Sequence, residues 1–257
     1  MADFAKSLTA KLARRGIAAS EFCNLSNAVE RRIVKEYGAV FLNADAEVEM
    51  PDRCCFKNES EVAAFQVTLK ISKRTIGGCM IELQRAAMNA LLKAADAVAI
   101  TPKGACPARR SFADVQISWD ETVKAATDYW RENPNSEGKT LSAKQAENLE
   151  SLAGERQIKL IFELEEQNFL FHPDRARSIA VYTAIPGASQ HLLMLALDIE
   201  EYADEKVRGA LAENGWFQTV VSDLPHFTYL GVSEKELPKL GLKKVENCGQ
   251  MFWIPNI

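Results

Sequence analysis

Several features that would place a chain in a specialised class are missing from this sequence. It has no run of about 18 apolar residues, so we expect no membrane-spanning helix. Its charge is balanced, with 31 Lys and Arg against 35 Asp and Glu. The net charge of -4 gives no reason to expect nucleic-acid binding. No internal repeat or low-complexity tract is present. The chain therefore belongs with ordinary globular proteins, and its function has to be sought in local motifs.

The six cysteines show neither a metal-binding nor a scaffold pattern. No C-x-x-C pair occurs, which argues against a cysteine zinc site. A chain of 257 residues can also bury a sizeable core without a disulfide framework. Cys54 and Cys55 are adjacent, and neighbouring residues rarely bridge each other. The cysteines therefore leave the disulfide state and the cellular compartment open.

The N-terminal segment does not have the pattern of a secretory signal, because it lacks a continuous apolar stretch of about 7–15 residues. Phe4, Leu8 and Leu12 instead recur at helical spacing, which predicts a surface helix ending at Gly16. A signal removed from a longer chain is the alternative. We expect residues 1–100 to form a helix-rich region packed on a catalytic part at 101–257, with one continuous domain as the alternative.

Hydrophobic spacing predicts helices mainly in the first two thirds of the chain and strands mainly in the last third. Beyond the first helix, the predicted helices cover residues 27–37, 60–69, 80–98, 112–130, 142–152, 155–167 and 204–213. The predicted strands cover residues 39–42, 97–101, 178–183, 195–199, 216–221 and 226–230. This order predicts an α+β fold, with a mainly antiparallel sheet and helices packed on it.

Histidine is scarce, and two of the three histidines lie in unusual contexts. His191 precedes Asp198 by seven residues, and His226 follows in the segment SDLPHFTY. Two imidazoles and one carboxylate suit zinc, which then keeps a position for water and lowers the pKa of that water towards about 7. His191, Asp198 and His226 are therefore the predicted ligands of one Zn²⁺ per chain, and structural histidines are the alternative. His172, before a proline, is interpreted as a loop residue.

Asp223 is the predicted general base, because a carboxylate near the metal has to accept a proton from water and pass it to the leaving amine. Residues three apart on a regular strand face opposite sides, so Asp223 and His226 can converge only across a bend. Pro225 lies between them and makes a turn or bulge there plausible.

The segment 186–199 resembles the S-x-H-x-x-G-x-A-x-D signature of VanY-type zinc D-alanyl-D-alanine carboxypeptidases, which are related to VanX dipeptidases and the hedgehog fold. Ser189, His191, Ala196 and Asp198 carry the match. Residues 223–226 resemble the second signature, E-x-W-H. The similarity extends over about residues 178–231 and more weakly from about residue 100.

The resemblance implies further roles and a function. Arg110, in the segment ARRSFADVQ, matches the arginine that holds the substrate carboxylate or carbonyl, with Gln116 one position late for the usual glutamine. A solvated arginine at a helix start is the alternative. Ser189 and Arg110 are the expected substrate-binding residues. The expected reaction is hydrolysis of peptidoglycan stem peptides by zinc-bound water, in the cell envelope, with Asp223 and Arg110 as catalytic residues.

Three departures from the signatures bear on this expectation. Met194 replaces a glycine, Asp223 replaces the longer glutamate, and Leu224 with Pro225 precedes the ligand histidine. The shorter carboxylate favours the alternative of a non-catalytic zinc-containing module that binds peptidoglycan or another peptide. A metal-free α+β interaction protein is the third hypothesis. The sequence gives no indication of the oligomeric state.

Overall fold

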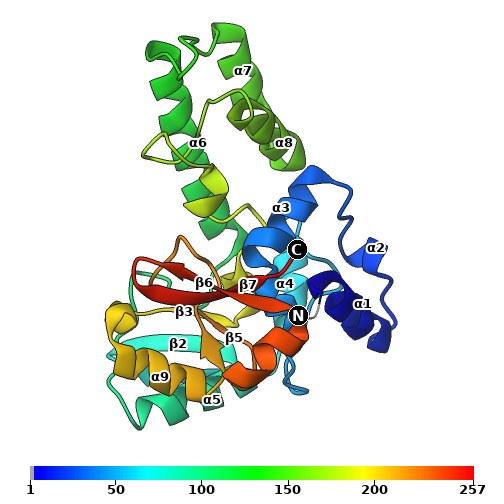
Figure 1. Ribbon diagram of the computed structural model, residues 1–257, viewed down its shortest axis with the longest axis vertical. Coiled ribbons are helices and arrows are strands. Elements are labelled where there is room, and N and C mark those ends of the chain that lie inside the picture. The colour runs from blue at the N-terminus through cyan, green and yellow to red at the C-terminus, as the bar shows by residue number, and fades with distance from the viewer. Residues whose placement is uncertain (1–2) are drawn as a thin grey trace.

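The computed structural model describes residues 3–257, and its helices and strands are shown in Figure 1. The α-helices are α1 (Phe4–Arg14), α2 (Ala19–Phe22), α3 (Ala28–Tyr37), α4 (Glu59–Thr68), α5 (Arg85–Ala95), α6 (Phe112–Glu132), α7 (Ala143–Ser151), α8 (Gly154–Glu165) and α9 (Glu205–Glu213). The 3-10 helices are η1 (Gly38–Leu42), η2 (Ile179–Val181), η3 (Gln190–Leu193), η4 (Glu200–Ala203) and η5 (Glu234–Leu240). The strands are β1 (Ile71–Ile76), β2 (Cys79–Gln84), β3 (Ala196–Asp198), β4 (Trp216–Phe217), β5 (His226–Tyr229), β6 (Leu242–Asn247) and β7 (Gln250–Pro255).

All the strand pairs are antiparallel, so the predicted α+β class is confirmed for the described part of the chain. The central sheet has the order β3-β5-β4, and two hairpins, β1-β2 and β6-β7, accompany it. In the central sheet Asp198 of β3 lies directly opposite His226 of β5. Sheet register alone therefore brings two of the predicted metal ligands together.

Two hydrophobic cores hold the molecule together. The larger core surrounds the sheets and draws on both sides of residue 100, for example Leu83 and Leu91 with Leu197 and Trp216. The second core lies between α3, α6, α8 and the segment 169–188, and it contains the fully buried Trp119. Figure 1 shows α6, α7 and α8 as a helical arm that projects from the part holding the sheets.

Most predicted helices are present, and side-chain caps explain where several of them begin. The Asp3 carboxylate caps α1, whose Phe4, Leu8 and Leu12 are buried. Asn27 caps α3 as the sequence predicted. Ser111 and Asp114 form a reciprocal capping box at the start of α6.

Several predicted elements in apolar stretches were wrong. Residues 80–84 belong to β2, not to a helix, because they pair with β1 across a turn at Gly77 and Gly78, both of which have positive φ. Residues 39–42 form the buried 3-10 helix η1, and residues 178–183 contain η2, where strands were predicted. Residues 97–101 form no strand, although the neighbouring Pro102 makes an isolated bridge to Ile199. Short apolar runs do not distinguish a strand from a buried helical turn.

One disulfide is present in the described chain. It joins Cys23 to Cys54, which are 31 residues apart in sequence. Glu30 lies close to both sulfurs, but the sulfurs are bonded to each other and so are not free to bind a metal ion. The free cysteines are Cys55, Cys79, Cys106 and Cys248.

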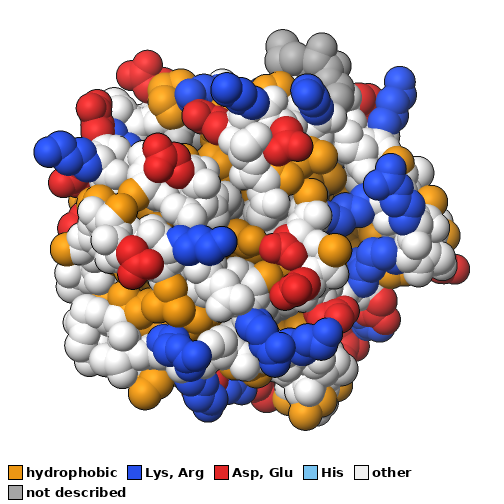
Figure 2. All heavy atoms as spheres, turned by 90° about the horizontal axis from the view of Figure 1, so that it is seen from below, with side chains coloured by type: hydrophobic (Ala, Val, Ile, Leu, Met, Phe, Trp, Pro, Cys, Tyr) orange, Lys and Arg blue, Asp and Glu red, His pale blue; other side chains and the backbone are white. Residues whose placement is uncertain are grey.

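The surface carries charges of both signs. Figure 2 shows Lys and Arg side chains interspersed with Asp and Glu over one face, with apolar side chains between them. Among the described residues, no helix is both long enough and apolar enough to cross a membrane.

Candidate metal centre

His191, Asp198 and His226 meet in one buried group that can hold a metal ion. His191 lies in η3, Asp198 ends β3 and His226 begins β5. The three ligand atoms form a nearly regular triangle. His191 Nε2 is 3.1 Å from His226 Nδ1 and 3.3 Å from Asp198 Oδ1, and His226 Nδ1 is 3.0 Å from Asp198 Oδ1. All three predicted ligands are therefore brought together by the fold.

The outer ring nitrogens fix which atoms face the centre. His191 Nδ1 lies 2.8 Å from the carbonyl oxygen of Ala108, and His226 Nε2 lies 2.8 Å from the amide oxygen of Gln190. Carbonyl and amide oxygens only accept hydrogen bonds, so each of these nitrogens donates. A neutral imidazole carries one proton, so both inner nitrogens present lone pairs. With both imidazoles neutral, two lone pairs and a carboxylate oxygen face one another, an arrangement that a metal cation would stabilise.

The dimensions of the triangle suit a small tetrahedral ion. Metal–ligand distances of about 2.0–2.1 Å in tetrahedral zinc sites place neighbouring ligand atoms about 3.3 Å apart. The observed separations of 3.0–3.3 Å agree with that value. Two nitrogens and one oxygen from protein side chains also leave the fourth position of a tetrahedron to a non-protein ligand.

The two carboxylate oxygens of Asp198 have different partners, the histidines of the centre and Arg110. Oδ1 faces the histidines, whereas Oδ2 accepts a 2.7 Å hydrogen bond from Arg110 Nη2. Burial alone would raise the pKa of Asp198, but its contacts with His191 and His226 outweigh burial and hold the pKa below its usual range. Burial lowers the pKa of His191, which favours the neutral, ligating imidazole. The two directions favour an ionised carboxylate and a neutral imidazole, which are the forms that bind a metal ion.

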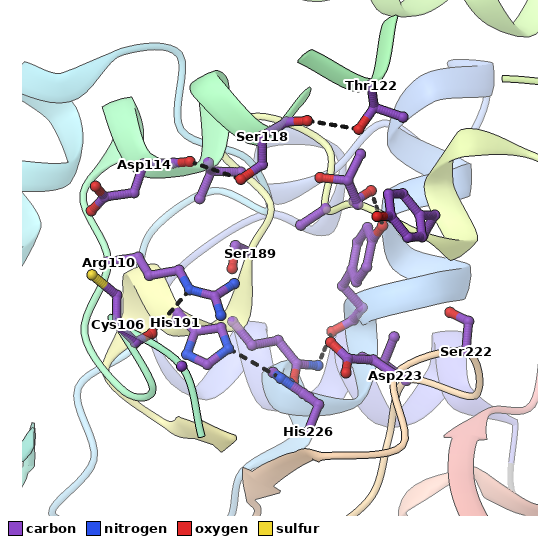
Figure 3. A pocket seen from close by; sticks show the side chains of 18 of the residues that line it. Cys106, Arg110, Asp114, Ser118, Thr122, Ser189, His191, Ser222, Asp223 and His226 are labelled. Atoms are coloured by element: carbon purple, nitrogen blue, oxygen red, sulfur yellow. Dashed lines mark hydrogen bonds between the residues drawn. The ribbon is translucent and has the colours of Figure 1, made fainter. Parts of the chain in front are cut away.

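A cavity of about 540 Å³ opens over the centre, and all the predicted site residues except Asp198 line it. Arg110, Ser189 and Asp223 line it together with His191 and His226. In Figure 3, Arg110 lies beside His191 with His226 next to them, and Asp114, Ser118 and Thr122 of α6 lie across the pocket.

The Arg110 guanidinium has two protein acceptors and further N–H groups to spare. Its Nε donates to the carbonyl of Cys106 at 3.2 Å, and its Nη2 donates to Asp198. The side chain is 31% exposed and lines the cavity, so the remaining N–H groups are open to a ligand. The Gln116 amide instead donates to Asp120 on the same helix, and Gln116 is absent from the pocket lining.

The bend predicted around Pro225 is present. The backbone N–H of His226 donates to the carbonyl of Asp223 at 3.2 Å, which closes a turn immediately before β5. The turn places Asp223 and His226 on the same cavity. Among the described residues, the Asp223 carboxylate makes no hydrogen bond, so both its oxygens are available to a ligand or a water molecule.

Met194 has a left-handed backbone, with φ 55° and ψ 37°, at the end of η3. This conformation favours glycine, and here methionine adopts it with a fully buried side chain. The turn that carries His191 therefore ends in a left-handed backbone conformation typical of glycine, although the residue there is methionine.

His172 is not part of the buried group of potential metal ligands. It lies in the loop that the sequence predicted, and its Nδ1 is 2.7 Å from Asp174 Oδ1. Burial, followed by the charge of Arg177, lowers the pKa of His172.

Residues from the N-terminal part support the turn that carries His191, and sequence reasoning missed them. Gln66 Nε2 donates to the carbonyl of Leu192, and Gln84 Nε2 donates to that of Leu193. The backbone N–H of Gln84 donates to the carbonyl of Met194. Isolated glutamines in a helix and at the end of a strand carry no periodic signal, so only the folded structure identifies them.

Three comparisons with known proteins gave no match: no family model fits the chain, and neither a curated protein nor a solved structure resembles it significantly. A function for this chain therefore has to be inferred from the geometry of the site and from the two short signatures.

Proposed function

We propose that this protein is a zinc metallopeptidase that hydrolyses short peptides. The observation that carries the proposal is the triangle of three inward-facing acceptor atoms at the floor of an open cavity. Zinc is favoured over harder cations because two of the three donors are imidazole nitrogens. When bound, the metal supplies a Lewis acid and a water of lowered pKa.

The protein's own residues have distinct tasks in this proposal. His191 and His226 are held with lone pairs directed at the centre, and Asp198 supplies the anionic ligand. Asp223 accepts a proton from the hydrolytic water and returns it to the leaving amine. Arg110 directs its unused N–H groups at a substrate carboxylate or carbonyl, and it also fixes the orientation of Asp198. Ser189 lines the cavity near Arg110 and contacts the substrate backbone.

The proposed substrates are peptidoglycan stem peptides, with a D,D-carboxypeptidase-like cleavage. Support comes from the resemblance to the two VanY-type signatures and from the left-handed backbone of Met194, which stands where that family has glycine. The Cys23–Cys54 disulfide supports an envelope location, because disulfides persist in oxidising compartments.

Metal analysis followed by digestion of defined muropeptides tests the proposal. We expect about one zinc per chain after metal-replete purification, chelator-sensitive cleavage of a terminal D-residue, and recovery on adding zinc. Absence of zinc from protein purified in this way would contradict the metal site. Zinc with no cleavage of any muropeptide, together with measurable peptidoglycan binding, would favour a non-catalytic binding module instead.

A further inference from the structure

We propose that Gln190 is a positioning residue that selects the metal-binding tautomer of His226. This inference rests on the metal centre of the proposed function, but its main test is made on metal-free protein. Gln190 is the residue before His191, is only 2% exposed, and lies outside the matched positions of the two signatures. Its side chain lies on the outer side of His226, away from Asp198.

The orientation of the Gln190 amide is determined by its partners. Its Nε2 donates a 2.8 Å hydrogen bond to the backbone carbonyl of Tyr37, which can only accept. Reversing the amide would place its oxygen against the Tyr37 carbonyl oxygen, two acceptors with no proton between them in a buried site, which is unfavourable. The amide nitrogen therefore faces Tyr37, and the amide oxygen faces His226.

Threonine hydroxyls reinforce that orientation. Thr228 Oγ1 donates to the Gln190 amide oxygen, and Thr219 Oγ1 lies 2.7 Å from Thr228 Oγ1 and 3.2 Å from Gln190 Nε2. Both threonines are fully buried. Because water has no access to exchange partners here, the network has one well-satisfied arrangement.

The choice of tautomer follows from the fixed oxygen. His226 Nε2, 2.8 Å from the Gln190 amide oxygen, has to carry the proton. His226 Nδ1 is then the lone-pair nitrogen, and it points at Asp198 Oδ1 and His191 Nε2. Without the Gln190 acceptor, the proton has an alternative partner at 3.0 Å, because Nδ1–H can donate to Asp198. That tautomer blocks the metal position with a hydrogen atom.

The network also connects the N-terminal region to the centre. Tyr37 is the last residue of α3 and the residue before η1, and its carbonyl accepts from the Gln190 side chain. Its hydroxyl donates to the carbonyl of Ala180 at 2.6 Å, so the residue is held at both ends. Tyr37 thus anchors Gln190, which in turn orients His226.

Nitrogen NMR of metal-free protein at pH 8 tests the tautomer directly. The chain has three histidines, so the variants His172→Gln and His191→Gln together assign the His226 signals by elimination. We expect His226 of the wild-type chain to be the Nε2–H tautomer and that of Gln190→Met to shift towards Nδ1–H. Gln190→Glu keeps an acceptor and should retain the wild-type tautomer. A wild-type His226 that is Nδ1–H would overturn the inference, even if Gln190→Met fails to fold.

Zinc affinity supplies the second measurement. Removing an outer partner of a metal-bound histidine usually weakens metal affinity about 10–100-fold, which is the loss expected for Gln190→Met. Gln157→Met is the matched control, since it also removes a buried glutamine but from the second core. Unchanged affinity in a folded Gln190→Met variant contradicts the inference. If wild-type protein binds no zinc, the proposed function fails, while the NMR result still decides the role of Gln190.

Discussion

In the proposed mechanism, Asp198 and Arg110 couple metal binding to substrate binding at the level of single residues. The Asp198 carboxylate uses one oxygen for the centre and the other for Arg110, whose side chain lines the cavity. A substrate carboxylate bound to the remaining N–H groups of Arg110 would therefore share one guanidinium with Asp198. Any change at Arg110 should alter both the affinity for metal and the affinity for substrate.

We expect Arg110→Met to raise KM about 10-fold or more, because the lost charged hydrogen bonds contribute roughly 1.5–3 kcal/mol each. The zinc dissociation constant should rise as well, since Asp198 Oδ2 loses its partner. Arg110→Lys keeps the positive charge but lacks the paired N–H groups of a guanidinium, so it should recover only part of the lost substrate affinity and zinc affinity. Arg177→Met, at a surface pair with Asp174, is the control. A change in kcat alone would contradict the substrate-binding role.

A separate prediction concerns Asp223, the one residue of the proposed machinery whose type departs from the signatures. Asp223→Asn keeps the shape but removes the proton acceptor, so kcat should fall about 10²–10⁴-fold with zinc content unchanged. Asp223→Glu should retain activity, because the turn before β5 leaves the carboxylate without protein partners and free to adjust. Activity assays with metal analysis on both variants provide the check, and full activity in Asp223→Asn would assign the base elsewhere.

At the residue scale the sequence predicted which three residues form the buried group, but it did not predict the residues that support them. His191, Asp198 and His226 carry chemistry that is recognisable from residue type and spacing. Gln190 depends on contacts with Tyr37 and Thr228, which are 153 and 38 residues away in the chain. No local pattern encodes such contacts.

At the scale of helices and strands, the predictions were closest where capping residues and hydrophobic spacing both indicated the same element. The helices with side-chain caps and one apolar face were predicted closely, as α3 and α6 illustrate. The error at residues 80–84 arose because β2 runs directly into α5, so apolar residues of a strand and a helix merged into one apparent helical pattern. The hairpins β1-β2 and β6-β7 depend on pairing with a partner strand, which periodicity within one segment does not reveal.

Helix α1 carries a half-buried lysine that should limit stability near neutral pH. Burial, followed by the charges of Arg15 and Arg14, lowers the pKa of Lys11 from 10.5 to about 8. The folded pKa lies below the unfolded one, so the stability contribution is fully present above about pH 10.5 and is lost as pH falls through about 8. At pH 7 the charged lysine therefore destabilises the fold.

Lys11→Met should raise the free energy of unfolding at pH 7 by about 1–3 kcal/mol, given roughly 1.4 kcal/mol for each unit of pKa difference. Denaturant unfolding at pH 7 and pH 10 provides the measurement, and the gain should shrink at the higher pH. Lys6→Met, on the exposed side of the same helix, is the matched control. An equal gain from both substitutions would attribute the effect to general surface charge.

Considered as a whole, the molecule uses its N-terminal region as a scaffold for a centre built from the C-terminal part. Gln66 and Gln84 hold successive carbonyls of the turn that carries His191. Phe56 contributes a further contact, since its N–H donates to the carbonyl of Gly187 at 3.0 Å. Gly187 has φ +83°, and a Cβ there would lie 1.8 Å from the Phe56 carbonyl oxygen, so the two segments approach as closely as glycine allows.

The Cys23–Cys54 disulfide anchors the segment that makes this contact, and its removal should affect both stability and the centre. A closed loop with a sequence separation of 31 residues corresponds to about 3–4 kcal/mol of denatured-state entropy. The double variant Cys23→Ser/Cys54→Ser should lose a comparable amount in denaturant unfolding, and dithiothreitol should have the same effect on wild-type protein. Cys248→Ser, at an exposed free cysteine, should change nothing. Phe56 lies two residues beyond Cys54 and contacts Gly187, so the zinc dissociation constant should also rise in the double variant. An unchanged dissociation constant would mean that Gln66 and Gln84 alone suffice to hold the turn that carries His191.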